Sequence, residues 1–112
     1  MAFGFPAYHE ETARYRGVTR EELRRAAQEA LDDIGWSWHK EGRWRILASV
    51  PAEFIAIFFT WGAKLTVEIE EKAVWVRSEG TFALAWFDLG QHQANTGKFL
   101  RRLDEILLEG AP

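Results

Sequence analysis

Three histidines, His9, His39 and His92, are the side chains of this chain that could bind a metal or transfer a proton. Their spacing matches none of the HxH, HxxxH or HExxH patterns that direct several ligands toward one ion. The chain has no cysteine, which excludes thiolate zinc sites, iron–sulfur clusters, disulfides and cysteine nucleophiles. We therefore expect no metal and no cofactor.

Paired carboxylates are the next candidates for acid–base chemistry, at Glu10-Glu11, Glu21-Glu22, Asp32-Asp33 and Glu70-Glu71. Neighbouring residues on a helix or in a turn diverge, whereas an acid–base pair must converge on one site. The serines lack a GxSxG context, and the glycines form neither GxGxxG nor GxxxxGK[ST]. Enzymatic activity has no positive support from these patterns; it stays undecided, with a preference against it.

The segment that begins at Asp88 carries the polar residues best placed for a defined role. Asp88 and Gly90 precede a predicted helix, and an Asp there can accept hydrogen bonds from free backbone N–H groups. Asn95 lies four residues before Phe99 and eight before Leu103, which places it on the apolar side of that helix. A buried Asn needs partners, and we expect backbone groups of a nearby strand or loop. We interpret Asn95 as a structural pin.

Three stretches of the chain resemble a group of small bacterial proteins for which no activity is established. These are a Trp-Gly strand at residues 60–67, a Val-x-Val-x-Ser strand at residues 74–78, and an Asp-x-Gly element at residues 88–90 that leads into a helix ending Phe-Leu-x-x-Leu. That group has an Asn where this chain has His92 or Gln93. The resemblance covers most of residues 19–107. It implies the order helix, strands, helix, and nothing about activity.

Length and composition limit the classes of function. The chain has 112 residues and a net charge of −3, which favours one domain and argues against a basic nucleic-acid binder. The longest apolar run, residues 54–59, is far shorter than the ~20 residues of a spanning helix, and no secretory signal is visible. We expect a cytoplasmic single domain over residues 1–112, without membrane or nucleic-acid partners. Residues 1–17 form an aromatic N-terminal arm in this interpretation, and residues 18–110 form the core.

Hydrophobic periodicity predicts two helices that flank a set of short strands. The first helix covers residues 19–34, with Thr19 and Glu22 as a capping box and Gly35 as its stop. The last helix begins at residue 91 or 94 and ends at residue 108. Strands are expected near residues 36–39, 43–50, 54–61, 65–69, 74–78 and 82–88, and their short loops require mainly antiparallel pairing. The prediction is an α+β domain: an N-terminal helix, a five- or six-stranded antiparallel sheet, and a C-terminal helix, with both helices on one face.

Alternation along the strands sorts side chains onto the two faces of this sheet. If Leu65, Val67 and Ile69 face the helices, then Val74, Val76 and Ser78 do so too. The second face then receives polar residues together with large apolar ones. The candidate binding residues on or beside it are Trp75, Trp86, Leu84, Arg77 and Trp61.

Three explanations for this second face stay open. The N-terminal arm, with Phe3, Phe5, Tyr8 and Tyr15, could fold across it; a second copy of the chain could pair with it; or it could line a pocket for an apolar or planar molecule. The main hypothesis is a non-catalytic binding or protein-interaction module, with a homo-oligomer or another protein as partner. The alternative is a small-molecule-binding or enzymatic domain with a pocket between sheet and helices.

Overall fold

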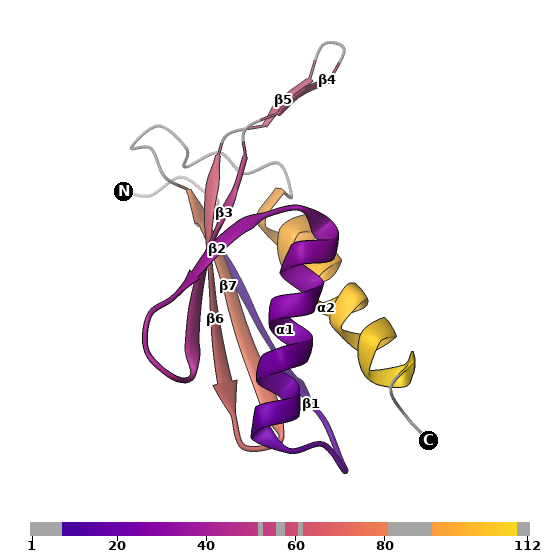
Figure 1. Ribbon diagram of the computed structural model, residues 1–112. Helices are drawn as coiled ribbons and strands as arrows, with labels where there is room; N and C mark the ends of the chain where they lie inside the picture. The colour runs from indigo at the N-terminus through magenta and orange to yellow at the C-terminus, as the bar shows by residue number, and fades with distance from the viewer. Residues whose placement is uncertain (1–7, 52, 56–57, 61, 81–90, 110–112) are drawn as a thin grey trace, which may run out of the picture.

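Strands and two helices form an α+β structure in the computed structural model, which describes residues 8–51, 53–55, 58–60, 62–80 and 91–109 (Figure 1). The elements in chain order are β1 (Tyr8–Arg14), α1 (Arg20–Ile34), β2 (Ser37–Lys40), β3 (Arg45–Val50), β4 (Glu53–Ile55), β5 (Phe58–Thr60), β6 (Ala63–Glu70), β7 (Ala73–Gly80) and α2 (Gln91–Glu109). The predicted α+β class is confirmed. The strand expected at residues 82–88 lies outside the described residues.

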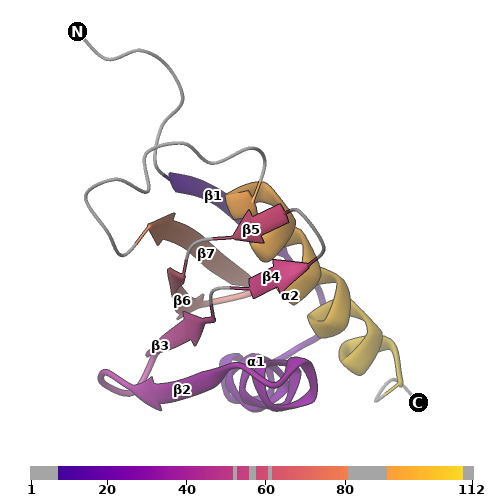
Figure 2. The same cartoon turned by 90° about the horizontal axis from the view of Figure 1, so that it is seen from above.

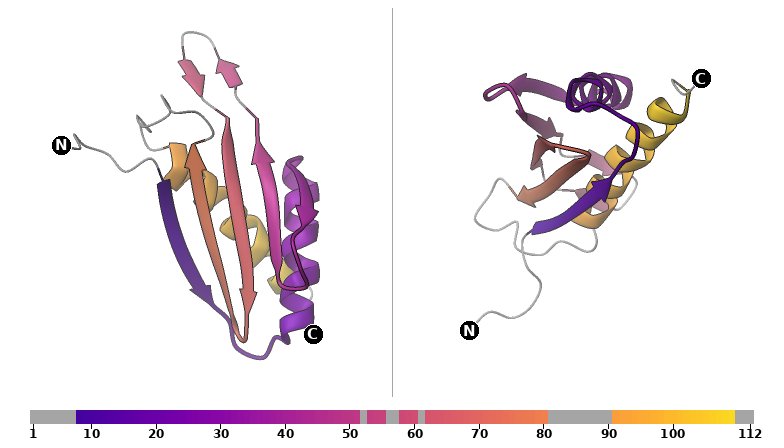
Figure 3. Two further views of the ribbon diagram at one scale, coloured as in Figure 1. Left: turned by 90° about the vertical axis from the view of Figure 1, so that its left-hand side faces the viewer. Right: turned by 90° about the horizontal axis from the view of Figure 1, so that it is seen from below.

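The main sheet has five strands in the order β1-β7-β6-β3-β2, and every neighbouring pair is antiparallel. Figure 3 shows these strands side by side, and Figure 2 shows both helices on the same side of the sheet. Within this sheet, consecutive strands pair through short turns in two places, β2 with β3 and β6 with β7. The antiparallel sheet with both helices on one face is therefore as predicted.

β1 corrects the predicted order, because a strand and not a helix comes first. Residues 8–14 were assigned to an N-terminal arm, and one of the three open explanations had this arm folded across the second face of the sheet. They instead extend the sheet at its edge, with His9 opposite Ser78 and Thr12 opposite Trp75. Burial alternates residue by residue along β1, as it must when one side of a strand faces a packed helix. The aromatic Tyr15 then turns to the helix side and packs against the core.

α1 begins and ends at the predicted residues. The Thr19 hydroxyl accepts a hydrogen bond from the Glu22 N–H at 3.1 Å, and the Glu22 carboxylate accepts one from the Thr19 N–H at 2.9 Å. Gly35 ends the helix with φ of 92°, a conformation that costs glycine little because it has no Cβ. Leu23, Ala27 and Leu31 on its inner side are fully buried.

The stretch that we predicted as one strand at residues 54–61 forms two. β4 and β5 pair with each other, Phe54 opposite Phe59, in a separate two-stranded sheet. This hairpin projects beyond the ends of β3 and β6 (Figure 1). A continuous apolar run does not reveal where a chain reverses when no Gly or Pro marks the turn, so periodicity alone favoured a single strand.

The hydrophobic core lies between the sheet and the two helices. Val67 of β6 and Val76 of β7 are fully buried beneath Leu23 of α1 and Phe99 of α2, in a cluster that also includes Trp36. The faces assigned from alternation are correct for β6 and β7, since Leu65, Val67, Ile69, Val74, Val76 and Ser78 are all buried there. Among the described residues, neither helix is long and apolar enough to cross a membrane.

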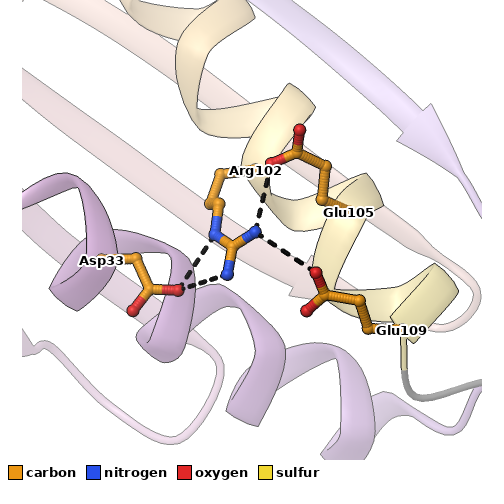
Figure 4. A network of polar contacts seen from close by, with 4 residues as sticks. All are labelled: Asp33, Arg102, Glu105 and Glu109. Atoms are coloured by element: carbon orange, nitrogen blue, oxygen red, sulfur yellow. Dashed lines mark hydrogen bonds and ion pairs between the residues drawn. The ribbon is translucent and has the colours of Figure 1, made fainter.

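Arg102 of α2 fastens the two helices to each other near the end of α1. Its guanidinium donates two hydrogen bonds to Asp33, from Nε at 3.0 Å and from a terminal nitrogen at 2.8 Å (Figure 4). It also contacts Glu105 at 3.1 Å and Glu109 at 3.7 Å on its own helix. The hydrogen bond to Asp33 is the main reason that the pKa of Arg102 lies above its ordinary value. From this contact the helices diverge toward the end of α2 (Figure 1).

Candidate functional site

The face of the five-stranded sheet that points away from both helices is the surface singled out by the sequence, and we call it the open face. The strand register defines its residues, of which Thr66 and Ala73 are buried and the others are partly or fully exposed. They are Tyr8, Glu10, Thr12, Arg14, Ser37, His39, Arg45, Leu47, Ser49, Lys64, Thr66, Glu68, Glu70, Ala73, Trp75, Arg77 and Glu79. Of the candidate binding residues, Trp75 and Arg77 lie on this face, while Trp61, Leu84 and Trp86 lie outside the described residues.

Trp75 is held in the middle of the open face by β7, the strand between β1 and β6. In the register it stands between Thr12 and Glu68, with Arg45 next beyond Glu68. It is partly exposed, and of the described residues only Tyr8 and Leu108 are large apolar side chains with high exposure. The described part of this face presents Trp75, Tyr8 and Leu47 among polar and charged groups, and the remaining apolar residues expected beside them lie outside the described residues.

The charges around Trp75 neutralise one another in pairs. Arg77 lies 3.9 Å from the Glu10 carboxylate, and its guanidinium carbon is 4.1 Å from the centre of the Tyr8 ring. Arg45 bonds to Glu68, whose hydrogen bond raises the pKa of that guanidinium. Such cross-strand ion pairs and cation–π contacts order long side chains on a sheet surface. The open face is consequently an ordered surface of mixed charge.

A second group of polar side chains lies on the opposite side of the sheet, where α2 packs across β1 and β7. The Thr96 hydroxyl contacts the Glu11 carboxylate at 2.7 Å, and that carboxylate lies 3.5 Å from Nε2 of His9. The Asn95 amide donates to the Ser78 hydroxyl at 3.1 Å. We call these five residues the polar cluster. They join the first turns of α2 to the edge of the sheet.

Asn95 is buried as predicted, with 9% of its surface exposed. Its partner is the Ser78 side chain and not a backbone group, which corrects our expectation. His9 and Glu11 were not recognised as members of a site, because a strand so close to the N-terminus was not predicted. Asp88 and Gly90 lie outside the described residues, and the side chain of His92 is not described either.

The polar cluster contains a serine, a histidine and a carboxylate, the residue types of a nucleophilic triad. Ser78 and His9 are opposite each other in the register, and Glu11 is two residues along the same strand. However, Ser78 is fully buried, so its hydroxyl cannot reach a substrate. Within the described structure the cluster is therefore a polar joint between helix and sheet. No group of three or more potential metal ligands occurs among the described residues.

Tyr15 forms a further contact between the N-terminal region and α2, because its hydroxyl donates to Asp104 at 2.7 Å. Burial, and then the hydrogen bond to the Asp104 carboxylate, raise the pKa of Tyr15 far above its ordinary value of 10.0. The phenol thus stays neutral in the folded protein at a pH where the unfolded chain already loses its proton.

We predict that Tyr15 makes the protein less stable at alkaline pH. Its contribution is fully present below the unfolded pKa of 10.0 and is lost as pH rises above that value. Melting temperatures from neutral pH to about pH 11 test this: the wild type and the control Tyr8→Phe should decline, and Tyr15→Phe should decline less. Equal slopes for the wild type and Tyr15→Phe would contradict the prediction.

No protein-family model matches this chain, and no curated protein matches it. The proposals below therefore rest on the residues and their geometry.

Proposed function

We propose that this chain is a non-catalytic interaction module that binds a protein through its open face, and that a second copy of the chain is the partner. Trp75 carries the proposal, because it is partly exposed in the middle of a face that neither helix covers. Tryptophan is enriched at the energetic centres of interfaces, where a large rigid ring buries much area at little entropic cost. We further propose a cytoplasmic location.

The balance of charge on the open face supports a second copy as the partner. Its acidic residues are Glu10, Glu68, Glu70 and Glu79, and its basic residues are Arg14, Arg45, Lys64 and Arg77. A surface with both signs in equal number can complement itself under a two-fold rotation. A strongly one-signed face would instead repel its own copy.

One arrangement brings opposite groups together. If the two-fold axis runs parallel to the sheet, just outside the open face and perpendicular to the strands, each strand lies over its own copy in the opposite direction. The residues that stand beside Trp75 across the strands then face those beside the partner's Arg77. Those beside Ala73 face those beside the partner's Glu79. Trp75 would lie against the partner's Arg77, a cation–π contact, and Lys64 against the partner's Glu70. We expect weak, reversible association, since a single tryptophan and rim-type ion pairs stabilise an interface modestly.

Self-association is measured by sedimentation equilibrium over a wide concentration range. We expect the average mass of the wild type to rise above that of one 12.9 kDa chain as concentration increases. Trp75→Ala should shift this rise to higher concentration, while the control Leu108→Ala, which lies away from the open face, should not. Lys64→Glu should weaken association and the double variant Lys64→Glu/Glu70→Lys should restore it. A wild-type mass that stays at one chain throughout contradicts the proposal.

The alternative function is the binding of a small molecule. We expected its pocket between the sheet and the helices, and the fully buried Val67, Val76 and Phe99 fill that space in the described structure. What supports this alternative is instead a groove between the two helices.

A further inference from the structure

A groove of about 750 Å³ lies between α1 and the last turns of α2, closed at one end by the loop that joins β1 to α1. Its lining residues on α2 follow Arg102 along the chain and those on α1 precede Asp33, and in this part of the molecule the two helices diverge (Figure 1). This volume is within the range of small-molecule sites. The groove is on the helix side of the molecule and is separate from the open face.

The floor of the groove is the edge of the hydrophobic core. Ala26 of α1 and Ile106 of α2 belong to the buried core, with 5% and 9% of their surfaces exposed. Val18 and Leu107 pack against that core and line the groove as well. Leu108 also lines the groove, and 75% of its surface is exposed. An occupant with an aliphatic body would cover this apolar surface and remove it from water.

The sides of the groove carry more carboxylates than guanidinium groups. Glu22, Glu29 and Asp104 line it against Arg16 and Arg25. Asp104 is oriented by the Tyr15 hydroxyl at 2.7 Å and keeps a second oxygen for another donor. The Glu29 carboxylate makes no hydrogen bond or ion pair within the described part of the chain, so it is available to a ligand. An excess of negative charge beside an apolar floor complements a cation attached to an alkyl chain.

We propose that the groove binds a small amphiphile with an aliphatic body and a cationic ammonium head. The aliphatic body lies along Val18, Ala26 and Leu107, and the head lies beside Asp104 and Glu29. The site depends on neither self-association nor Trp75.

The test is a titration of the whole chain with octyltrimethylammonium below its micelle concentration, followed by methyl and backbone NMR. We expect saturable shifts at Val18, Ala26 and Leu107. Octanoate has a similar alkyl chain with a negative head, and tetramethylammonium has the cationic head without the alkyl chain. Each should bind more weakly than octyltrimethylammonium by about fivefold or more. Shifts confined to the open face, no saturable shifts, or equal affinity for octanoate would overturn the proposal.

Variants test the recognition of the head. Glu29→Gln removes a negative charge that has no partner among the described residues and should leave the fold intact. Asp104→Asn removes the negative charge of the carboxylate that the Tyr15 hydroxyl orients. We expect each variant to weaken octyltrimethylammonium binding several-fold and to reduce its preference over octanoate. Glu71→Gln, in the turn between β6 and β7, is the matched control and should bind as the wild type does. Unchanged affinity in both groove variants would overturn the role of the carboxylates.

Discussion

Replacing Phe99 by alanine is expected to lower the free energy of unfolding by about 3–5 kcal/mol, the largest single effect that we predict. Phe99 is fully buried and is the largest fully buried side chain among the described residues. Truncation removes its apolar surface from the core and leaves a cavity between α2 and the sheet that the neighbours fill only partly. Because domains of this kind are stable by about 5–15 kcal/mol, the loss would remove a large share of the stability.

Urea denaturation followed by circular dichroism measures this loss. Leu108→Ala is the matched control on the same helix, since Leu108 is 75% exposed and its truncation should change stability by only about 0.5 kcal/mol or less. A Phe99→Ala variant as stable as this control would mean that α2 does not pack as described.

Replacing Asn95 by leucine is expected to lower the free energy of unfolding by about 0.5–1.5 kcal/mol, because a buried hydrogen bond is lost between α2 and β7. The Asn95 amide donates to the fully buried Ser78 hydroxyl at 3.1 Å. A leucine of similar size fills the space and cannot donate. The midpoint of urea denaturation should therefore fall with little change in slope.

A double-mutant cycle isolates this hydrogen bond from other effects of the substitution. If Asn95 acts through Ser78, the variant Asn95→Leu/Ser78→Ala should lose less stability than the sum of the two single variants. Strict additivity would show that the two side chains act independently. An unchanged midpoint for Asn95→Leu alone would refute the interpretation of Asn95 as a structural pin.

Local signals predicted the best-defined elements of the fold. The capping box at Thr19 and Glu22 and the stop at Gly35 set both ends of α1, because they satisfy backbone groups that the helix itself leaves free. Alternation in β6 and β7 assigned Val67 and Val76 to the core and Trp75 to the other face. These features depend on neighbours within a few residues, so the sequence around them is sufficient.

β1 could not be predicted in the same way, since its strand partner is far along the chain. Residues 8–14 pair with residues 73–79, and no turn connects the two strands. The inward side of β1 carries His9 and Glu11, which hides the alternation of apolar residues that marks a half-buried strand. Glu11 is satisfied by Thr96 of α2, a contact that only the folded chain brings together.

Of the five candidate binding residues, two lie in the described structure on the face that was predicted for them, and three lie outside the described residues. The strand parity placed Trp75 and Arg77 on the helix-free face, but it does not report how neighbouring charges pair. Glu10, from the unpredicted β1, neutralises Arg77, and Tyr8 covers its guanidinium. The ion pairs around Trp75 therefore appear only in the folded chain, and the surroundings of Trp86 lie outside the described residues.

Backbone amide NMR over a dilution series tests the central claim most directly, because it reports both whether copies associate and through which surface. Our account predicts concentration-dependent shifts centred on Trp75 and Arg77 of β7 and on the adjoining residues of β1 and β6, with α1 and α2 unchanged. The shifts should shrink in Trp75→Ala. Spectra that do not change with concentration, or changes confined to the helices, would contradict the open face as the interaction surface of this protein.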